Sequence, residues 1–167
     1  MALEIERRFL LEAMPQVPSD ARVERITQHY LFATDKMTMR VRHIAHVDGD
    51  RYRLTFKEKV GPGVSEEYET DISGEDYERS ARNAIASISK TRTTLPYGKY
   101  ALEIDQFDID PELLIPHYGR DRLIIAEVEL PRRNAALRLK LDVPFQEITG
   151  EDCYSNITLA LVAAGKI

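Results

Sequence analysis

The stretch LEIERRFLL, residues 3–11, decides the expected fold because charged and apolar side chains alternate along it. Glu4, Glu6 and Arg8 stand two residues apart, and four of the five positions between and around them are apolar. Successive side chains of a β-strand point to opposite faces, so this pattern predicts a strand with one apolar and one charged face. Such a charged face is either solvated or directed into an enclosed site.

Composition and charge indicate an ordinary globular protein. The chain has 167 residues, enough for one domain over 1–167 with a substantial core, and its hydrophobic content is 43%. A net charge of −5 argues against a general nucleic-acid binder, which needs a basic surface. Cys153, the single cysteine, allows no intrachain disulfide and fits a reducing compartment.

Nothing in the chain reads as a targeting or membrane segment. Charged residues interrupt the first ten positions, which therefore contain no signal-peptide core. No apolar run approaches the roughly 20 residues that a membrane helix needs. We therefore expect a cytoplasmic protein with neither membrane nor nucleic-acid partners. The sequence does not decide between a monomer and a homodimer.

Alternation of the same kind recurs along most of the chain. It is present in residues 26–32, 37–44, 51–59, 65–72, 88–95, 100–107 and 122–130. The turn-forming stretches ATDK, VDGD and VGPGV separate the early segments, and such short connections imply antiparallel neighbours. The pattern predicts an α+β fold dominated by an antiparallel sheet of about eight strands, a number that allows closure into a barrel.

Three segments break this pattern. Residues 73–88 carry apolar side chains at helical spacing behind Ser73, which predicts a helix capped by that serine. Residues 131–139 begin with proline, which is typical of a first helical turn, and predict a short helix. The tail, residues 152–165, has an apolar stripe suited to packing on the outside of the sheet.

Alternate residues of a predicted strand form one face, and we call the choice of alternate positions its parity. One parity of these strands carries doublets, which are pairs of residues of the same charge on one strand. The acidic doublets are Glu4 and Glu6, Glu67 and Glu69, Glu103 and Asp105, and Glu127 and Glu129; the basic ones are Arg40 and Arg42, Arg53 and Lys57, and Lys90 and Arg92. Any single doublet is compatible with a solvated face. A solvated face usually mixes signs, however, because like neighbours repel, so the whole set favours an enclosed site.

These doublets suit a polyanion complexed with a metal. Carboxylates two residues apart on a strand are about 7 Å apart and can hold a cation between them. Guanidinium groups at the same spacing suit successive phosphates. Carboxylate oxygens prefer Mg²⁺ or Mn²⁺, which bridge phosphate oxygens and offset charge at the reacting phosphorus. This chemistry requires no covalent nucleophile.

The motifs also resemble a known family in their order. The stretch EIERRF resembles the ExExK signature of the CYTH domains, also called triphosphate tunnel metalloenzymes. It is followed in the family's order by QHYL, MRVR, LTFK, EEYETDI, SKTR, LEIDQF, AEVEL and YSN. The resemblance implies a closed eight-stranded antiparallel β tunnel with helices packed outside. It also implies metal-dependent hydrolysis or cyclisation of triphosphates.

The resemblance assigns roles to individual residues. It implies that metal is held by Glu4, Glu6, Glu127 and Glu129, with Asp105 in addition, and that phosphates are bound by Arg40, Arg42, Lys57, Lys90 and Arg92. Arg8 and Arg53 join the substrate-binding set by their place on the charged parity, and Glu67, Glu69 and Glu103 are further tunnel acids. Tyr30 matches a tyrosine proposed as proton acceptor in short bacterial members, although a tyrosine that merely lines a strand is the alternative. Glu4 and Glu6 would also orient the attacking water.

The sequence departs from the family's pattern at both ends. Arg8 stands where the signature has lysine, so a planar guanidinium group replaces a compact ammonium group as the hydrogen-bond donor. Cys153 and Ser155 stand where many relatives place basic residues, so one end of the tunnel is expected to be less basic. These departures leave the preferred length of the substrate open.

We expect an inorganic triphosphatase that cleaves tripolyphosphate to pyrophosphate and phosphate with Mg²⁺ or Mn²⁺. Thiamine triphosphatase, nucleoside triphosphatase and class IV adenylate cyclase activities remain alternatives on the same fold. A non-catalytic polyphosphate- or nucleotide-binding module is another, but four acidic doublets would weaken the binding of an anion. His43 and His46 are not expected to bind metal together, because three residues apart on a strand they point to opposite faces.

Overall fold

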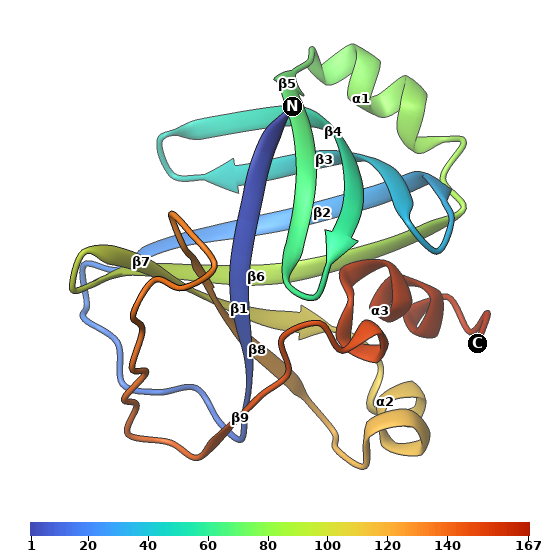
Figure 1. The fold of residues 1–167 in the computed structure, drawn as a ribbon. Helices are drawn as coiled ribbons and strands as arrows, with labels where there is room; N and C mark the ends of the chain where they lie inside the picture. Colours follow the sequence, from blue (N-terminus) through green and yellow to red (C-terminus); the bar gives the residue numbers. More distant parts are fainter.

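Eight antiparallel strands close into a ring in the computed structural model, which describes residues 1–167 (Figure 1). Around the ring the order is β1, β5, β4, β3, β2, β6, β7 and β8, and β8 pairs again with β1. The strands are β1 (Ala2–Leu11), β2 (Arg22–Ala33), β3 (Met37–His46), β4 (Gly49–Gly61), β5 (Val64–Asp71), β6 (Ala86–Tyr97), β7 (Tyr100–Asp108) and β8 (Leu123–Glu129), with a short β9 (Phe145–Glu147) added to the end of β1. The predicted closed antiparallel tunnel is confirmed.

An irregular segment covers the outer apolar face of β1, β7 and β8. It follows β8 and presents an apolar side chain at every second position, namely Ala135, Leu137, Leu139, Leu141 and Val143. Tyr100 Oη donates to the carbonyl of Ala136 at 2.9 Å and helps to hold the segment in place. The short helix predicted over residues 131–139 is therefore wrong: the period of two lays an extended chain along the sheet.

The first helix is shorter than its apolar pattern predicts. Helix α1 (Gly74–Ala81) begins as expected after Ser73, whose Oγ accepts the backbone N–H of Asp76 at 3.0 Å. It ends well before residue 88 because the chain returns to the barrel and the Ile85 N–H donates to the carbonyl of Tyr30 at 2.8 Å. Pairing with β2 thus overrides the local helical preference.

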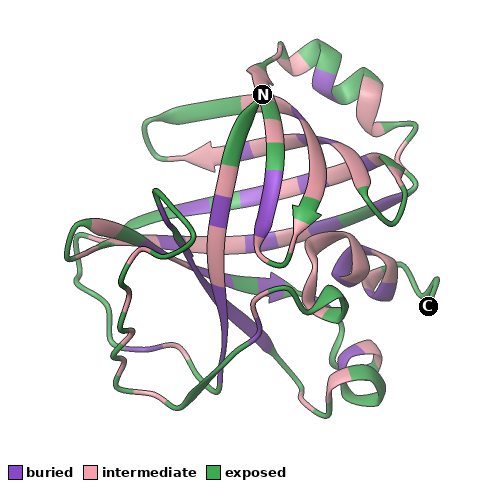
Figure 2. Cartoon of the chain, viewed as in Figure 1, coloured by how far each residue is buried: buried purple, intermediate pink, exposed green.

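Two further helices close one end of the barrel. Leu10, Ile88, Phe107 and Ile125 share their strand parity with charged residues of the interior, yet they form an apolar cluster with α3 (Asn156–Ala163). Helix α2 (Pro111–Tyr118), which the sequence reading did not predict, and the 3₁₀ turn η1 (Asp152–Tyr154) flank α3. The buried turns of α2 and α3 are visible in Figure 2. Helix α3 thus packs over one end of the barrel, which agrees with the expectation that the helices pack outside the sheet.

The hairpin between β4 and β5 fits closely against β1. The carbonyl of Gly63 accepts the N–H of Glu6 at 2.9 Å, and φ of Gly63 is +63°. A Cβ on Gly63 would lie 2.6 Å from the carbonyl oxygen of Glu6 and 2.6 Å from Cγ2 of Thr149. This turn therefore needs glycine both for its backbone conformation and for the approach of β1. None of the helices has the length and apolar character required to span a bilayer.

Gly63→Ala is expected to destabilise the protein more than Gly98→Ala. Gly98 has nearly the same φ, +60°, but no atom lies within 4 Å of the position of its Cβ. Gly98→Ala should cost about 1–2 kcal/mol of unfolding free energy through backbone strain alone. Gly63→Ala should add about 1–3 kcal/mol for the overlap with β1. Denaturant unfolding of both variants measures the difference, and equal losses would contradict the close packing.

Candidate functional site

A cavity of about 910 Å³ lies inside the barrel, and the charged parity of the strands faces it. Among the predicted site residues, its wall includes Glu4, Glu6, Arg8, Tyr30, Arg40, Arg42, Arg53, Lys57, Glu67, Glu69, Lys90, Arg92, Glu103, Glu127 and Glu129. Asp105 alone among them does not reach the wall. The doublets are thus gathered inside the barrel and do not form a solvated outer face.

The basic wall contains guanidinium atoms that have no partner. Arg40 and Arg42 project from β3, and the Nε atoms of both are buried without a hydrogen bond. Burial and the neighbouring charge of Arg40 lower the pKa of Arg42 to about 10. Arg40 lies directly opposite Tyr30 in the register of β2 and β3. Two adjacent buried cations with free donors form a surface that an anion would stabilise.

Asp105 supports two of the basic residues from behind. Its carboxylate is fully buried and accepts hydrogen bonds from Lys90 Nζ at 2.5 Å and from Arg92 Nε at 2.7 Å. Burial lowers the pKa of Lys90 to about 8, although Asp105 opposes this change. Here Asp105 fixes the positions of Lys90 and Arg92, and its role as a metal ligand stays a prediction.

Carboxylates stand opposite carboxylates where β1, β7 and β8 meet. In the strand register Glu6 faces Glu129, and Glu103 faces Glu127. Glu127 is compensated, because Arg8 Nε lies 2.9 Å from Oε1 and Arg92 Nη2 lies 3.0 Å from Oε2. Like charges directly opposite on neighbouring strands are destabilising. The stability of the barrel therefore does not explain this arrangement.

Glu6 lacks the compensation that Glu127 has. No hydrogen bond or ion pair reaches its side chain, and burial, followed by the charge of Glu127, raises its pKa to about 7. Arg8, although near, is already engaged by Glu127 through Nε and by the carbonyl of Tyr154 through Nη1. The free energy of the Glu6 carboxylate therefore remains high until another cation arrives.

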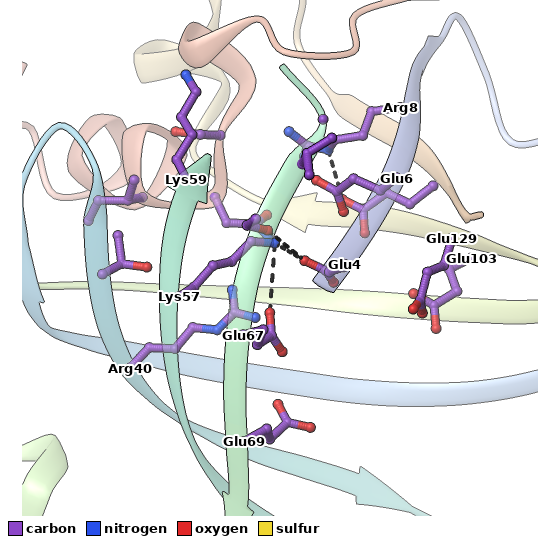
Figure 3. A pocket seen from close by; sticks show the side chains of 18 of the residues that line it. Glu4, Glu6, Arg8, Arg40, Lys57, Lys59, Glu67, Glu69, Glu103 and Glu129 are labelled. Atoms are coloured by element: carbon purple, nitrogen blue, oxygen red, sulfur yellow. Dashed lines mark hydrogen bonds and ion pairs between the residues drawn. The ribbon is translucent and has the colours of Figure 1, made fainter. Parts of the chain in front are cut away.

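A third group of acids shares one lysine, as Figure 3 shows. Lys57 Nζ forms an ion pair with Glu4 and lies 3.8 Å from Glu67 Oε2, and Ser65 Oγ donates to Glu4 at 3.1 Å. Burial and the charge of Glu4 raise the pKa of Glu67. Farther along β5, Glu69 accepts from Arg42, Arg53 and Thr55. Glu4 and Glu67 therefore share the single cation Lys57, whereas Glu69 has two cations of its own, Arg42 and Arg53.

The donor set fits a divalent cation by its chemistry. In this structure no three His, Cys, Asp or Glu side chains are gathered closely enough to hold a metal between them. The carboxylates of Glu6 and Glu129 are nevertheless hard oxygen donors at paired positions of β1 and β8, and Glu6 is without a partner. A cation bound beside Glu6 would offset the charge of that carboxylate and its repulsion by Glu127. His43, by contrast, stacks on Tyr52 at 4.8 Å, away from these acids.

Several residues of the cavity wall escaped the sequence reading. They include Glu24, Arg51, Lys59, Lys99 and Asn156, whereas Ser155 was expected at one end of the tunnel. Glu24 shares its strand parity with Tyr30, so the alternation of β2 could have revealed it. Asn156 could not be found in this way, since it reaches the cavity only because the chain folds back over the end of the barrel. Cys153 is exposed and is not part of the wall.

A closed antiparallel barrel with a charged interior defines the structural class of this protein. The model of the CYTH domain matches residues 2–143. The chain therefore belongs to the CYTH domain family.

The relatives agree with this assignment. The chain is 30% identical over 164 residues to the inorganic triphosphatase of Acetivibrio thermocellus, which covers 95% of this chain and 94% of that protein. The crystal structure of the inorganic triphosphatase NE1496 is 27% identical, with a TM-score of 0.62 and 96% of each chain covered. A further solved structure is that of a Hippeastrum protein, described as a putative adenylyl cyclase with a dominant triphosphatase activity. It is 14% identical, with a TM-score of 0.52 over 77% of this chain and 80% of that one. At this identity the likeness shows a shared fold alone.

The charge arrangement predicts opposite effects of two Glu→Gln changes in metal-free protein at pH 8. Glu6→Gln should raise the unfolding free energy by about 1–3 kcal/mol, because the ionised form of this group is penalised in the folded state. Glu127→Gln should lower it by about 3–5 kcal/mol, because Arg8 and Arg92 lose their buried partner. Chemical denaturation with a chelator present measures both. A loss of stability in the Glu6 variant would contradict the described electrostatics.

Proposed function

We propose that this chain hydrolyses inorganic triphosphate to pyrophosphate and phosphate in the barrel cavity, with Mg²⁺ or Mn²⁺. The observation that carries the proposal is the coexistence, in one cavity, of opposed carboxylates and of buried guanidinium groups with free donors. A metal-complexed polyphosphate would satisfy both. The names of two relatives, both inorganic triphosphatases, support the choice of substrate.

The basic residues would bind and orient the substrate. Arg40 and Arg42 offer free Nε donors from β3, and Lys90 and Arg92 stand on β6 with their orientation fixed by Asp105. Phosphate oxygens have the bidentate geometry that guanidinium groups prefer. The remaining bases of the proposed site are Arg8, Arg53 and Lys57. These groups also stabilise the negative charge that develops on the leaving pyrophosphate.

The acidic residues would hold the metal. Glu4, Glu6, Glu127 and Glu129 are the proposed ligands, and Glu6 gains most because its carboxylate has no partner within the chain. A bound divalent cation supplies charge neutralisation on the triphosphate oxygens. Glu4 and Glu6 can also accept hydrogen bonds from the attacking water and orient it.

Tyr30 is the proposed acceptor of a proton from that water. Its side chain is buried, lines the cavity and receives a hydrogen bond from Gln28 Nε2 at 3.4 Å. Arg40 stands opposite Tyr30 in the register of β2 and β3. In the proposed step the water oxygen forms a bond to the terminal phosphorus, the bridging P–O bond breaks, and pyrophosphate leaves with the electron pair. The step requires Tyr30 in its phenolate form, and the water proton passes to the phenolate oxygen.

A phosphate-release panel tests this function. Purified protein is assayed with tripolyphosphate, thiamine triphosphate, ATP and pyrophosphate, each with Mg²⁺, with Mn²⁺ and with a chelator. We expect tripolyphosphate to be hydrolysed at least about tenfold faster than the organic triphosphates, a difference of 1.4 kcal/mol in barrier. Pyrophosphate should remain intact, and the chelator should stop the reaction. Faster release from ATP or thiamine triphosphate, or hydrolysis without metal, would contradict the proposal.

Arg40→Ala is expected to weaken the binding of tripolyphosphate by about 1.5–3 kcal/mol, the range for a hydrogen bond to a charged group. The matched control is Arg25→Ala on β2, because Arg25 is about half exposed and pairs with Asp108. The control should bind tripolyphosphate as the parent does. Calorimetric titration measures both variants, and parental affinity in Arg40→Ala would remove Arg40 from the site.

A further inference from the structure

The amino end of α3 faces the cavity. Ser155, Asn156 and Ile157 form part of its wall. The first N–H groups of a helix have no partner within the helix. Here the Ser155 side chain caps only one of them, because Ser155 Oγ accepts the N–H of Thr158 at 3.3 Å. The N–H groups of Asn156 and Ile157 are left for a partner outside the helix, and the helix dipole makes this end attractive to an anion.

A buried arginine offers a second free donor at the same place. Arg8 is 6% exposed, and its Nη1 donates at 2.9 Å to the carbonyl of Tyr154, which directly precedes the capping Ser155. Its Nη2 is buried and has no hydrogen-bond partner. Burial of an unpaired guanidinium nitrogen is costly, so this atom independently indicates a ligand beside the amino end of α3.

The surrounding chain holds this end of the helix in position. The backbone N–H of Arg8 donates to Thr149 Oγ1 at 3.0 Å, and Lys59 forms an ion pair with Asp152. Gly150 packs so tightly on the β4–β5 hairpin that a Cβ there would lie 2.7 Å from Cβ of Pro62. Because Asp152 is already paired with Lys59, its charge does not mask the positive end of the helix. The site is therefore built before a ligand arrives.

We propose that the amino end of α3 and Nη2 of Arg8 together bind the terminal phosphate group of the triphosphate. This inference rests on the proposed function and adds a subsite and an orientation to it. Beyond its first turn α3 continues into the apolar cluster that closes the barrel, through Leu159 and Ala160. A phosphate chain therefore ends at α3.

The opposite end of the barrel would receive the rest of a longer substrate. Phe107, near the end of β7, packs in the α3 cluster, whereas Tyr100, at the start of the same strand, lies at the far end of the cavity beside Lys99. An organic group attached to the triphosphate would lie toward Tyr100, and the unsubstituted phosphate toward α3.

Asn156→Asp separates this subsite from a purely structural role of the helix end. An acidic residue in the first turn of a helix stabilises it, so the variant should melt at the parental temperature or above. The same charge would repel a phosphate held by the Asn156 and Ile157 amides. We expect the affinity for tripolyphosphate, measured by calorimetry without metal, to fall by at least about tenfold, the order of one lost hydrogen bond to a charged group. Asn83→Asp, an exposed change of the same kind after α1, should bind as the parent does.

Amide NMR locates the contact directly. During titration of ¹⁵N-labelled parent protein with tripolyphosphate, the amide resonances of Asn156 and Ile157 should shift strongly, and they should shift little in the Arg8→Ala variant. The subsite is wrong if Asn156→Asp binds tripolyphosphate as the parent does and the resonances of these two amides do not shift. The proposed function still stands in that case, provided that the parent binds tripolyphosphate and Arg40→Ala weakens this binding. If the parent does not bind tripolyphosphate at all, the proposed function fails and this inference with it.

Discussion

Closure of the barrel forces charged side chains of like sign into a shared interior, and the remaining structure depends on this constraint. Because β1 pairs with β8 on one side and with β5 on the other, its charged parity has no open solvent to face. Glu6 then lies in the interior near Glu127, where burial and the charge of Glu127 raise its pKa. A folded chain tolerates such pairs only if the outer shell supplies enough stability, as the apolar cover on β1, β7 and β8 and the α3 cluster do.

The interior divides into charges that are satisfied within the chain and charges that are not. Asp105 is neutralised by Lys90 and Arg92, and such buried pairs contribute more to the position of each side chain than to net stability. Glu6 and the Nε atom of Arg40 remain without partners. The first group makes a rigid frame, and the second leaves donors and acceptors of opposite charge for an incoming cation and polyanion. In our account this division is what converts a stable barrel into a binding site.

Strand parity made most of this arrangement predictable. In a closed barrel the alternation of a strand determines which residues face inward, so the doublets around Arg40 and Glu127 could be assigned to one cavity without coordinates. Where tertiary contacts compete with local preference, the prediction failed. Pairing with β2 ended α1 at Ala81, and a period of two within residues 135–143 produced an extended cover in place of a helix. The inward-facing amino end of α3 depends on packing between distant segments, which no local pattern encodes.

The coupling between cation and polyanion tests the central claim most directly. The affinity for Mn²⁺ is measured by calorimetry with and without a non-hydrolysable imido analogue of tripolyphosphate. If opposed carboxylates and unpaired guanidinium groups form one site, each ligand should strengthen the other by at least about tenfold, or about 1.4 kcal/mol of coupling free energy. The coupling should vanish in a Glu6→Gln, Glu129→Gln double variant that remains folded. Independent binding of the two ligands to the parent protein would contradict the account.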